Sequence, residues 1–161
     1  VLSALREDLS QDPRTGVEEL VASAREAGAE VTVAYADGTD PGVFAGLSTM
    51  AQHAVHRAVQ EGLTNARKHA PGQPVSITVR EAAGAVDIEM RNPVPREKAG
   101  ADTGNGADTT GGYGLVGLRE RVELSGGRMS IVANQESPEG KGGEEFRWSI
   151  QLPLAHKEAT R

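Results

Sequence analysis

The feature that most constrains this chain is a long helical pattern over residues 55–71, VHRAVQEGLTNARKHAP. At 3.6 residues per turn, its apolar and small side chains recur every three or four positions, as on the buried face of an α-helix. That face is formed by Val55, Ala58, Val59, Gly62, Leu63, Ala66 and Ala70. We expect these residues to lie in the hydrophobic core, with the rest of the chain organised around this helix.

A second face of the same helix is polar. It carries Glu61, Thr64, Asn65, Lys68 and His69, which recur at the spacing that brings side chains together on a helix. A carboxylate, an amide, an ammonium group and an imidazole in one row can hold a metal–phosphate ligand. A polar face that only contacts water is the commoner outcome for such residues, and periodicity alone leaves that alternative open.

Composition excludes several classes of protein. The chain has 161 residues, which suits one domain that buries roughly two-thirds of its unfolded surface. Its formal charge of -6 argues against a nucleic-acid-binding protein. Without cysteine it has no disulfides, no thiolate metal site and no cysteine nucleophile. No apolar run approaches the roughly 18 residues of a membrane span, and the first residues lack a signal-peptide layout, so we expect a soluble, cytoplasmic protein.

Hydrophobic periodicity predicts an ordered series of elements. In chain order these are a turn (10–16), a helix (17–27), a strand (30–35), a long helical region (41–70) with a break near Ser48, and a hairpin (75–91). A flexible loop (97–112), a helix (115–126) and a second hairpin (128–154) follow. This order favours an α/β (α+β) two-layer sandwich, with one mixed sheet covered by helices on one face. Strands and helices do not alternate one for one, which disfavours a doubly wound sheet.

A glycine-rich stretch carries the second functional signal. Residues 97–112, EKAGADTGNGADTTGG, contain no side chain more apolar than alanine and are predicted to be a flexible loop. Gly111, Gly112, Gly114 and Gly117 then let backbone amides at a helix N-terminus approach an anion closely. Together with the polar helix face, this combination favours a nucleoside triphosphate, which needs metal ligands, a phosphate cradle and a cover.

Two motifs resemble a known family. EGLTNARKHA, residues 61–70, resembles the N box of the histidine-kinase-like ATPase domain. GGYGLVGLRERVELSGG, residues 111–127, resembles the second glycine box of NarL/DesK-type two-component sensor histidine kinases. The resemblance extends from about residue 17 to residue 154. It implies the Bergerat (GHKL) ATP-binding fold shared with gyrase, Hsp90 and MutL ATPases, with ATP and Mg²⁺ as cofactors.

The resemblance also implies roles for individual residues. Asn65 matches the family's Mg²⁺-binding asparagine, and Glu61 matches the residue that supports metal and water; these two form the implied catalytic pair. Lys68 matches a phosphate-contacting base. His69 falls beside the nucleotide, although a surface histidine without ligand contact remains the alternative. The second glycine box supplies further cofactor-binding residues: Gly112, Tyr113, Gly114, Leu115 and Gly117. Residues 97–111 match the ATP lid.

The first glycine box departs from the family pattern. The usual Asp-x-Gly-x-Gly appears here as residues 92–96, Asn-Pro-Val-Pro-Arg. Asn92 can accept a hydrogen bond from the exocyclic amine of adenine, but without charge assistance. The resemblance therefore implies weaker nucleotide binding or a looser preference for adenine. A loop-forming Asn-Pro pair without ligand contact is the alternative.

The chain carries no acceptor histidine of the family type. None of its four histidines, which are His53, His56, His69 and His156, lies in a pattern like ELHD. The resemblance thus implies an acceptor on a separate dimerisation domain, a downstream response regulator as partner, and no nucleic-acid partner. We expect residues 1–16 to be the stub of a preceding dimerisation helix and linker, residues 17–154 the ATPase domain and residues 155–161 a disordered tail. Such a fragment of a dimeric sensor is expected to be monomeric.

The predicted function is that of an ATP-binding catalytic domain, which binds Mg-ATP and delivers the γ-phosphate to a histidine on another domain. Two alternatives remain at this stage. One is a GHKL-type ATP hydrolase or serine kinase on the same fold, because Glu61 lies where ATPases of the wider superfamily carry a general base. The other is a degenerate interaction module that binds no nucleotide, which the altered box at Asn92 motivates.

Overall fold

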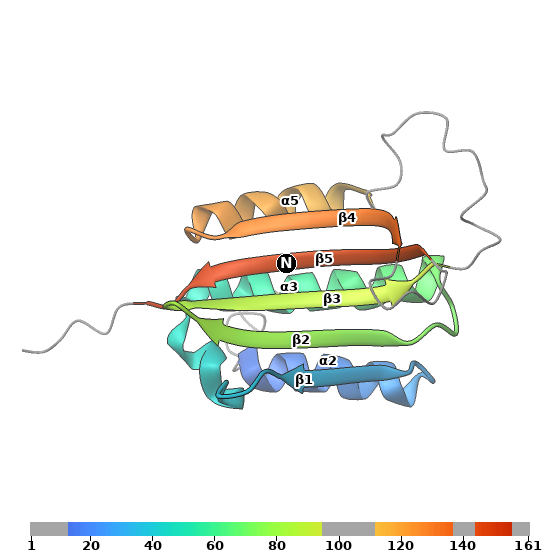
Figure 1. The fold of residues 1–161 in the computed structure, drawn as a ribbon, viewed down its shortest axis with the longest axis horizontal. Coiled ribbons are helices and arrows are strands. Elements are labelled where there is room, and N and C mark those ends of the chain that lie inside the picture. Colours follow the sequence, from blue (N-terminus) through green and yellow to red (C-terminus); the bar gives the residue numbers. More distant parts are fainter. Residues whose placement is uncertain (1–12, 95–111, 137–143, 156–161) are drawn as a thin grey trace, which may run out of the picture.

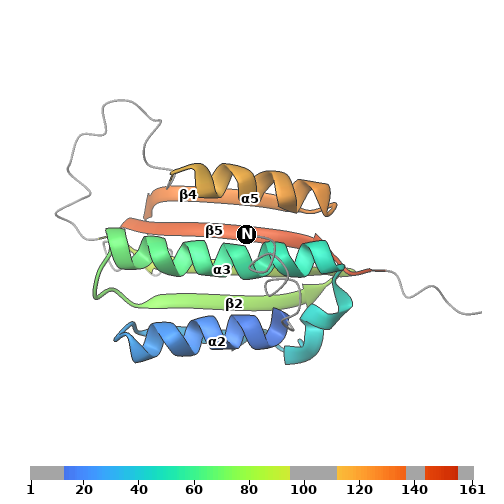
Figure 2. The same ribbon diagram turned by 180° about the vertical axis from the view of Figure 1, so that it is seen from behind.

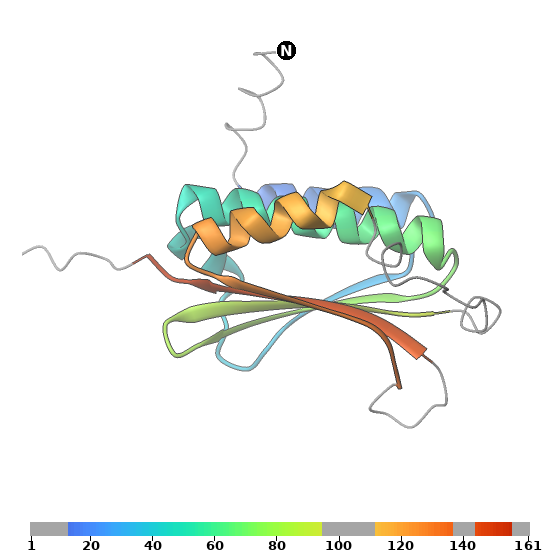
Figure 3. The same cartoon turned by 90° about the horizontal axis from the view of Figure 1, so that it is seen from above.

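The protein forms one mixed sheet with α-helices on a single face (Figures 1 and 3). The structure, a computed structural model, describes residues 13–94, 112–136 and 144–155. Its elements are α2 (Pro13–Glu26), β1 (Val31–Tyr35), the 3-10 helix η1 (Pro41–Gly46), α3 (Thr49–His69), β2 (Val75–Ala82), β3 (Ala85–Pro93), α5 (Gly112–Leu124), β4 (Arg128–Glu136) and β5 (Glu144–Pro153). The predicted two-layer sandwich is confirmed.

The sheet has the strand order β1-β2-β3-β5-β4. Strands β1 and β2 are parallel, whereas the other neighbouring pairs are antiparallel. The predicted hairpin of β2 and β3 is confirmed. It turns at Ala83 and Gly84, whose φ angles of 52° and 75° are those of a tight turn that matches the twist of its strands. This turn fixes which residues of β3 face the helices.

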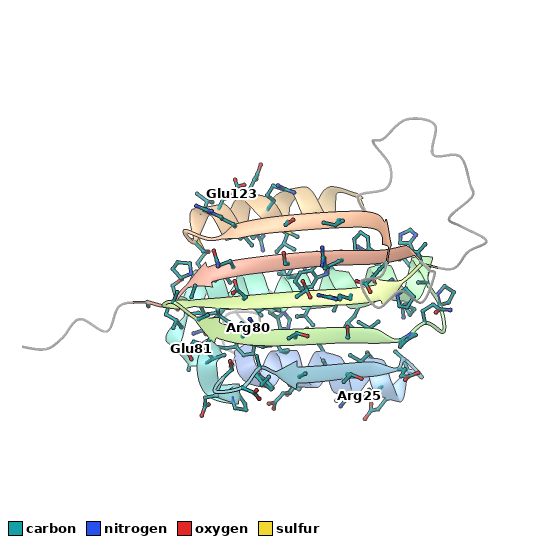
Figure 4. The ribbon with its side chains drawn as sticks, in the orientation of Figure 1. Arg25, Arg80, Glu81 and Glu123 are labelled. Atoms are coloured by element: carbon teal, nitrogen blue, oxygen red, sulfur yellow. The ribbon has the colours of Figure 1, made fainter. Side chains whose placement is uncertain are left out.

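Side chains alternate across the sheet and divide it into a core face and an open face. On β3, every second residue from Val86 to Asn92 is buried beneath the helices. The core also includes Ile77, Val79, Trp148, Ile150 and Leu152 of the sheet and Val55, Val59, Leu118 and Val122 of the helices. The open face is polar. Figure 4 looks onto it and marks Arg80 there, and Arg91 pairs with Glu89 at 2.5 Å between Nε and Oε1.

The long helical region is interrupted where the sequence predicted a break. Residues 41–46 form η1, a 3-10 helix rather than the α-helix expected from periodicity. Ser48 then caps α3, because its hydroxyl oxygen accepts a hydrogen bond from the Ala51 amide at 3.2 Å. Helix α5 ends at Leu124 and is capped by glycines, because Gly126 has a φ of 79° and the amides of Gly126 and Gly127 donate to Glu123 O and Val122 O.

Two sequence predictions are wrong in detail. Helix α2 begins at Pro13 instead of Val17, so residues 13–16 are not the predicted turn. The cause is that proline suits the first helical position, where no amide hydrogen is needed. Ala155, the first residue of the expected disordered tail, is also held in place by a hydrogen bond. Leu154 and Ala155 continue the order of β5, since their amides donate to Gly84 O at 2.9 Å and Gly46 O at 2.8 Å.

Some predictions lie outside the described residues. These are the helical stub as far as residue 12, the whole of the ATP lid at 97–111, and the tail from residue 156. Across the residues that the structure does describe, no helix is both long enough and apolar enough to cross a membrane.

Candidate functional site

Helix α3 lies at the centre of the helix layer, with α2 and α5 packed beside it (Figure 2). Its predicted apolar face is confirmed. Val55, Ala58, Val59, Gly62, Ala66 and the cap residue Ala70 are buried, and Leu63 is half-buried against the core. The last turn carries Arg67, Lys68 and His69, whose positive or polar groups complement the negative end of the helix dipole. The polar face of α3 is therefore held rigidly over the sheet.

The five polar residues of that face do not share one environment. Thr64 is half-buried and lines a groove between α2 and α3, together with Leu20 and Ser23. Asn65 and Glu61 are half-buried, and neither lines this groove. Lys68 and His69 are exposed in the last turn. The predicted row is thus reduced to Glu61 and Asn65, with the two exposed side chains beyond them.

Glu61 and Asn65 continue a row that begins in the core. Ala54 and Ala58 precede them at spacings of four and three residues, and both alanines are almost fully buried. The row therefore emerges from the core at Glu61, whose side chain is 27% exposed. Its carboxylate lies 3.9 Å from Arg57, a loose ion pair between neighbouring turns. Sequence reasoning missed Arg57, although its position four residues before Glu61 is the signal for such a pair.

Asn92 is a buried polar residue with few hydrogen bonds to the described part of the chain. Two polar residues in the described part of the chain are buried, Thr39 and Asn92. Thr39 has a structural role, because its hydroxyl oxygen accepts a hydrogen bond from the Glu81 amide at 2.9 Å. Asn92 makes a single bond among the described residues, from Nδ2 to the adjacent carbonyl of Pro93 at 3.3 Å. Its side-chain oxygen accepts no hydrogen bond from a described residue and is not among the fully buried atoms without a partner, so it can accept from a ligand.

The structure shows that Asn92 is a strand residue. The residue is not part of a loop, because β3 continues through Pro93 and Asn92 pairs with Phe146 of β5. Like Met90, it faces the helix layer and lies at the carboxyl end of β3. The loop alternative is therefore wrong. The amide is held in a fixed strand position beneath the helices.

The start of α5 contributes backbone groups. Gly112, Tyr113, Gly114 and Leu115 form its first turn, where no acidic residue opposes an anion. The amides of a first helical turn lack intrahelical partners and favour negative charge. Gly117 follows in the next turn and is exposed. A Cβ built at Gly117 would meet no described atom within 4 Å, so neither packing nor backbone geometry among the described residues requires glycine there.

These three features meet at one end of the molecule. The carboxyl-terminal half of α3, the end of β3 and the start of α5 lie at the same end of the two layers, because α5 runs antiparallel to α3 (Figures 1 and 2). Lys68 is at this end too and makes no ion pair with any described residue. The site thus offers an amide acceptor, a carboxylate and amide row, a free ammonium group and helix N-terminal amides.

The donor set suits magnesium better than a protein-enclosed metal ion. Within the described residues there is no group of three or more histidine, cysteine or acidic side chains that could hold a metal. Mg²⁺ prefers oxygen ligands and is usually held by one or two protein groups together with substrate phosphates and water. Asn65 and Glu61 offer one amide and one carboxylate oxygen donor within one helical turn. Their chemistry therefore fits this ion.

Comparison by sequence finds known proteins that are similar to this chain. A sequence model of the family described as histidine kinase-, DNA gyrase B- and HSP90-like ATPases matches residues 50–156. The signal transduction histidine-protein kinase/phosphatase DegS of Brevibacillus brevis is 34% identical over 82 residues, which make up 48% of this chain. The match covers only 19% of that relative, so this chain corresponds to a small part of it.

Solved structures share the fold. The mycobacterial sensor histidine kinase MprB superimposes with a TM-score of 0.55 at 15% identity, over 87% of this chain and 94% of that one. A nucleotide-free form of the catalytic domain of histidine kinase ThkA gives a TM-score of 0.55 at 16% identity, over 93% of each chain. At such low identity the likeness concerns the fold alone.

Proposed function

Because the chain belongs to the family of histidine kinase-, DNA gyrase B- and HSP90-like ATPases, we propose that it is the ATP-binding catalytic domain of a two-component sensor histidine kinase. The proposed reaction transfers the γ-phosphate of ATP to a histidine on a separate dimerisation domain, from which a response regulator receives it. DegS, which matches 48% of this chain, is by name a histidine-protein kinase, and this similarity supports the choice within the family.

The observation that carries the proposal is the position of Asn92, a buried residue at the end of a strand whose side-chain oxygen accepts no hydrogen bond from a described residue. An acceptor in this position suits the exocyclic amine of adenine, which donates hydrogen bonds. The amides at the start of α5 and the ammonium group of Lys68 would then hold the phosphates at the same end of the molecule. One nucleotide could span these groups from base to phosphate.

Asn65 and Glu61 would hold Mg²⁺ beside the phosphates. A bound magnesium ion would neutralise phosphate charge and orient the γ-phosphate. The protein's own part in the reaction is mainly positioning and electrostatic stabilisation, which are the main sources of catalysis in phosphoryl transfer. His69, exposed in the last turn of α3, would lie beside the nucleotide.

The test is the variant Asn65→Ala with Thr64→Ala as its matched control. Both remove a half-buried polar side chain from adjacent positions of α3, but Thr64 lines the groove toward α2. We expect Asn65→Ala to abolish Mg-nucleotide binding in calorimetry while circular dichroism shows an intact fold. Thr64→Ala should bind like the parent chain. Unchanged nucleotide affinity in Asn65→Ala would overturn the assignment of the site.

A second candidate function is slow ATP hydrolysis, and the exposure of Glu61 favours it. This carboxylate reaches solvent and has only a loose ion pair with Arg57, so it could accept a proton from water. Steady release of phosphate from ATP by the chain alone, lost in Glu61→Gln, would support hydrolysis. Without such release, the phosphotransfer proposal stands alone.

A further inference from the structure

Helix α3 packs tightly on the sheet at Gly62. The residue is buried, and a Cβ built on it would lie 2.7 Å from Nε1 of Trp148 and 3.1 Å from Cε of Met90. It would also collide with the sulfur of Met90. Real Cβ atoms essentially never come this close to another atom, so a side chain at position 62 would force a neighbour to move. Glycine therefore sets how near α3 lies to the sheet.

The two side chains beneath Gly62 form a pair across neighbouring strands. Met90 of β3 and Trp148 of β5 are in register, and both are almost fully buried. Met90 is flexible at its far end and can bend away, but the indole ring is rigid and enclosed by the core. Trp148 is consequently the fixed support on which α3 rests.

The hydrogen bonding of the indole nitrogen of Trp148 is unusual. Among the described residues it is the one fully buried side-chain nitrogen or oxygen without a hydrogen-bond partner. Leaving a buried donor unbonded costs about 1–3 kcal/mol. A phenylalanine would fill most of the same space without that cost. The tryptophan is thus poorly explained by stability alone, which points to a role for its size and position under the helix.

This contact lies between the two parts of the proposed nucleotide site. Gly62 follows Glu61 directly and precedes Asn65 by three residues. On the sheet, Met90 lies two residues before Asn92 on the same face, and Trp148 is two residues from Phe146, the strand partner of Asn92. The support therefore fixes the separation between the metal-binding row of α3 and the adenine-binding end of β3.

We infer that Gly62 and Trp148 are positioning residues that hold Asn65 and Glu61 at the height over the sheet that a magnesium nucleotide requires. This inference rests on the proposed function. A nucleotide bound through magnesium must contact both α3 and β3, so its affinity depends on their separation. A nucleotide bound without the metal depends on β3 and α5 and is less sensitive to the height of α3.

The experiment compares ADP affinity with and without Mg²⁺ in four variants, by calorimetry on the full chain. Gly62→Ala adds a methyl group against Trp148, and the double variant Gly62→Ala with Trp148→Phe removes the obstructing nitrogen. Gly16→Ala is the matched control, because its Cβ would also meet a ring at 2.7 Å, that of His56, but at the contact of α2 with α3. Trp148→Phe alone completes the set.

We expect Gly62→Ala to lower the gain in ADP affinity from Mg²⁺ about tenfold, since small misplacements of binding groups are costly. Metal-free ADP affinity should stay within about twofold of the parent value, and the double variant should recover most of the gain. Gly16→Ala should leave the gain unchanged. If Gly62→Ala leaves the gain in ADP affinity from Mg²⁺ unchanged, or loses equal ADP affinity with and without the metal, this inference is overturned. The proposed function would still stand.

Two further outcomes are decisive. If the parent chain binds no Mg-ADP, the proposed function fails and this inference fails with it. If Gly62→Ala does not fold, Trp148→Phe alone becomes the probe, because it removes part of the support for α3. The magnesium gain should then fall about threefold, and a gain equal to that of the parent would contradict the positioning role.

Discussion

Gly117 gives a prediction in which stability and ligand binding change in opposite directions. The residue lies within α5, is exposed, and has no described heavy atom within 4 Å of an ideal Cβ. Alanine should therefore fit without a packing cost. In a helix interior, replacing glycine by alanine is worth about 0.8–1 kcal/mol. For a domain of this size, that gain corresponds to a rise in Tm of about 2–4 °C.

The same methyl group should weaken nucleotide binding. Gly117 follows the first turn of α5, whose amides are proposed to hold the phosphates, and it lies three residues after Gly114 on nearly the same side of the helix. A methyl group there would obstruct the close approach of a ligand. We expect the affinity for Mg-ADP to fall about tenfold, which corresponds to about 1.4 kcal/mol.

Calorimetric titration with Mg-ADP and thermal unfolding of the ligand-free chain measure the two effects. Glu120→Ala, at an exposed position of the same helix, is the control and should change neither quantity appreciably. A lower Tm for Gly117→Ala would show that the position is not open. A higher Tm with unchanged affinity would refute the reasoning that links this glycine to the ligand.

Two other substitutions follow from the structure. Asn92→Asp should tighten ADP binding about fivefold and reduce GTP binding, because a carboxylate accepts a stronger hydrogen bond but cannot donate one to guanine. Calorimetry with both nucleotides measures the two affinities, and equal changes for both would contradict this prediction. Ser48→Ala should lower the free energy of unfolding by about 1 kcal/mol, because the cap on the Ala51 amide is lost, while nucleotide affinity is retained. Denaturant unfolding measures this free energy, and an unchanged midpoint would show that the cap contributes nothing.

Local sequence patterns predict much of the fold. The hairpin of β2 and β3 follows from alternation around a short turn, and the buried face of α3 follows from helical periodicity. Boundaries were less predictable. Pro13 begins a helix that was expected at Val17, because proline suits the first helical position. Ala155 extends the order of β5 through a bond to Gly46, a distant partner that no local pattern reveals.

The candidate site was predictable in its motifs but not in its geometry. The sequence identified Asn65 and the start of α5, yet spacing alone could not show that Thr64 lines a different groove. Nor could it show that Asn92 is a buried strand residue whose oxygen accepts no bond from a described residue, since that depends on the pairing of β3 with β5. The contact of Gly62 with Trp148 joins residues far apart in the chain and has no local signal.

Calorimetric titration of the chain with ATP, ADP and GTP, each with and without Mg²⁺, tests nucleotide binding most directly. We expect binding that is stronger with the metal and stronger for adenine than for guanine, because Asn65 and Glu61 would hold Mg²⁺ and Asn92 would accept from the adenine amine. A chain that is folded by circular dichroism but binds none of the three nucleotides would contradict this expectation.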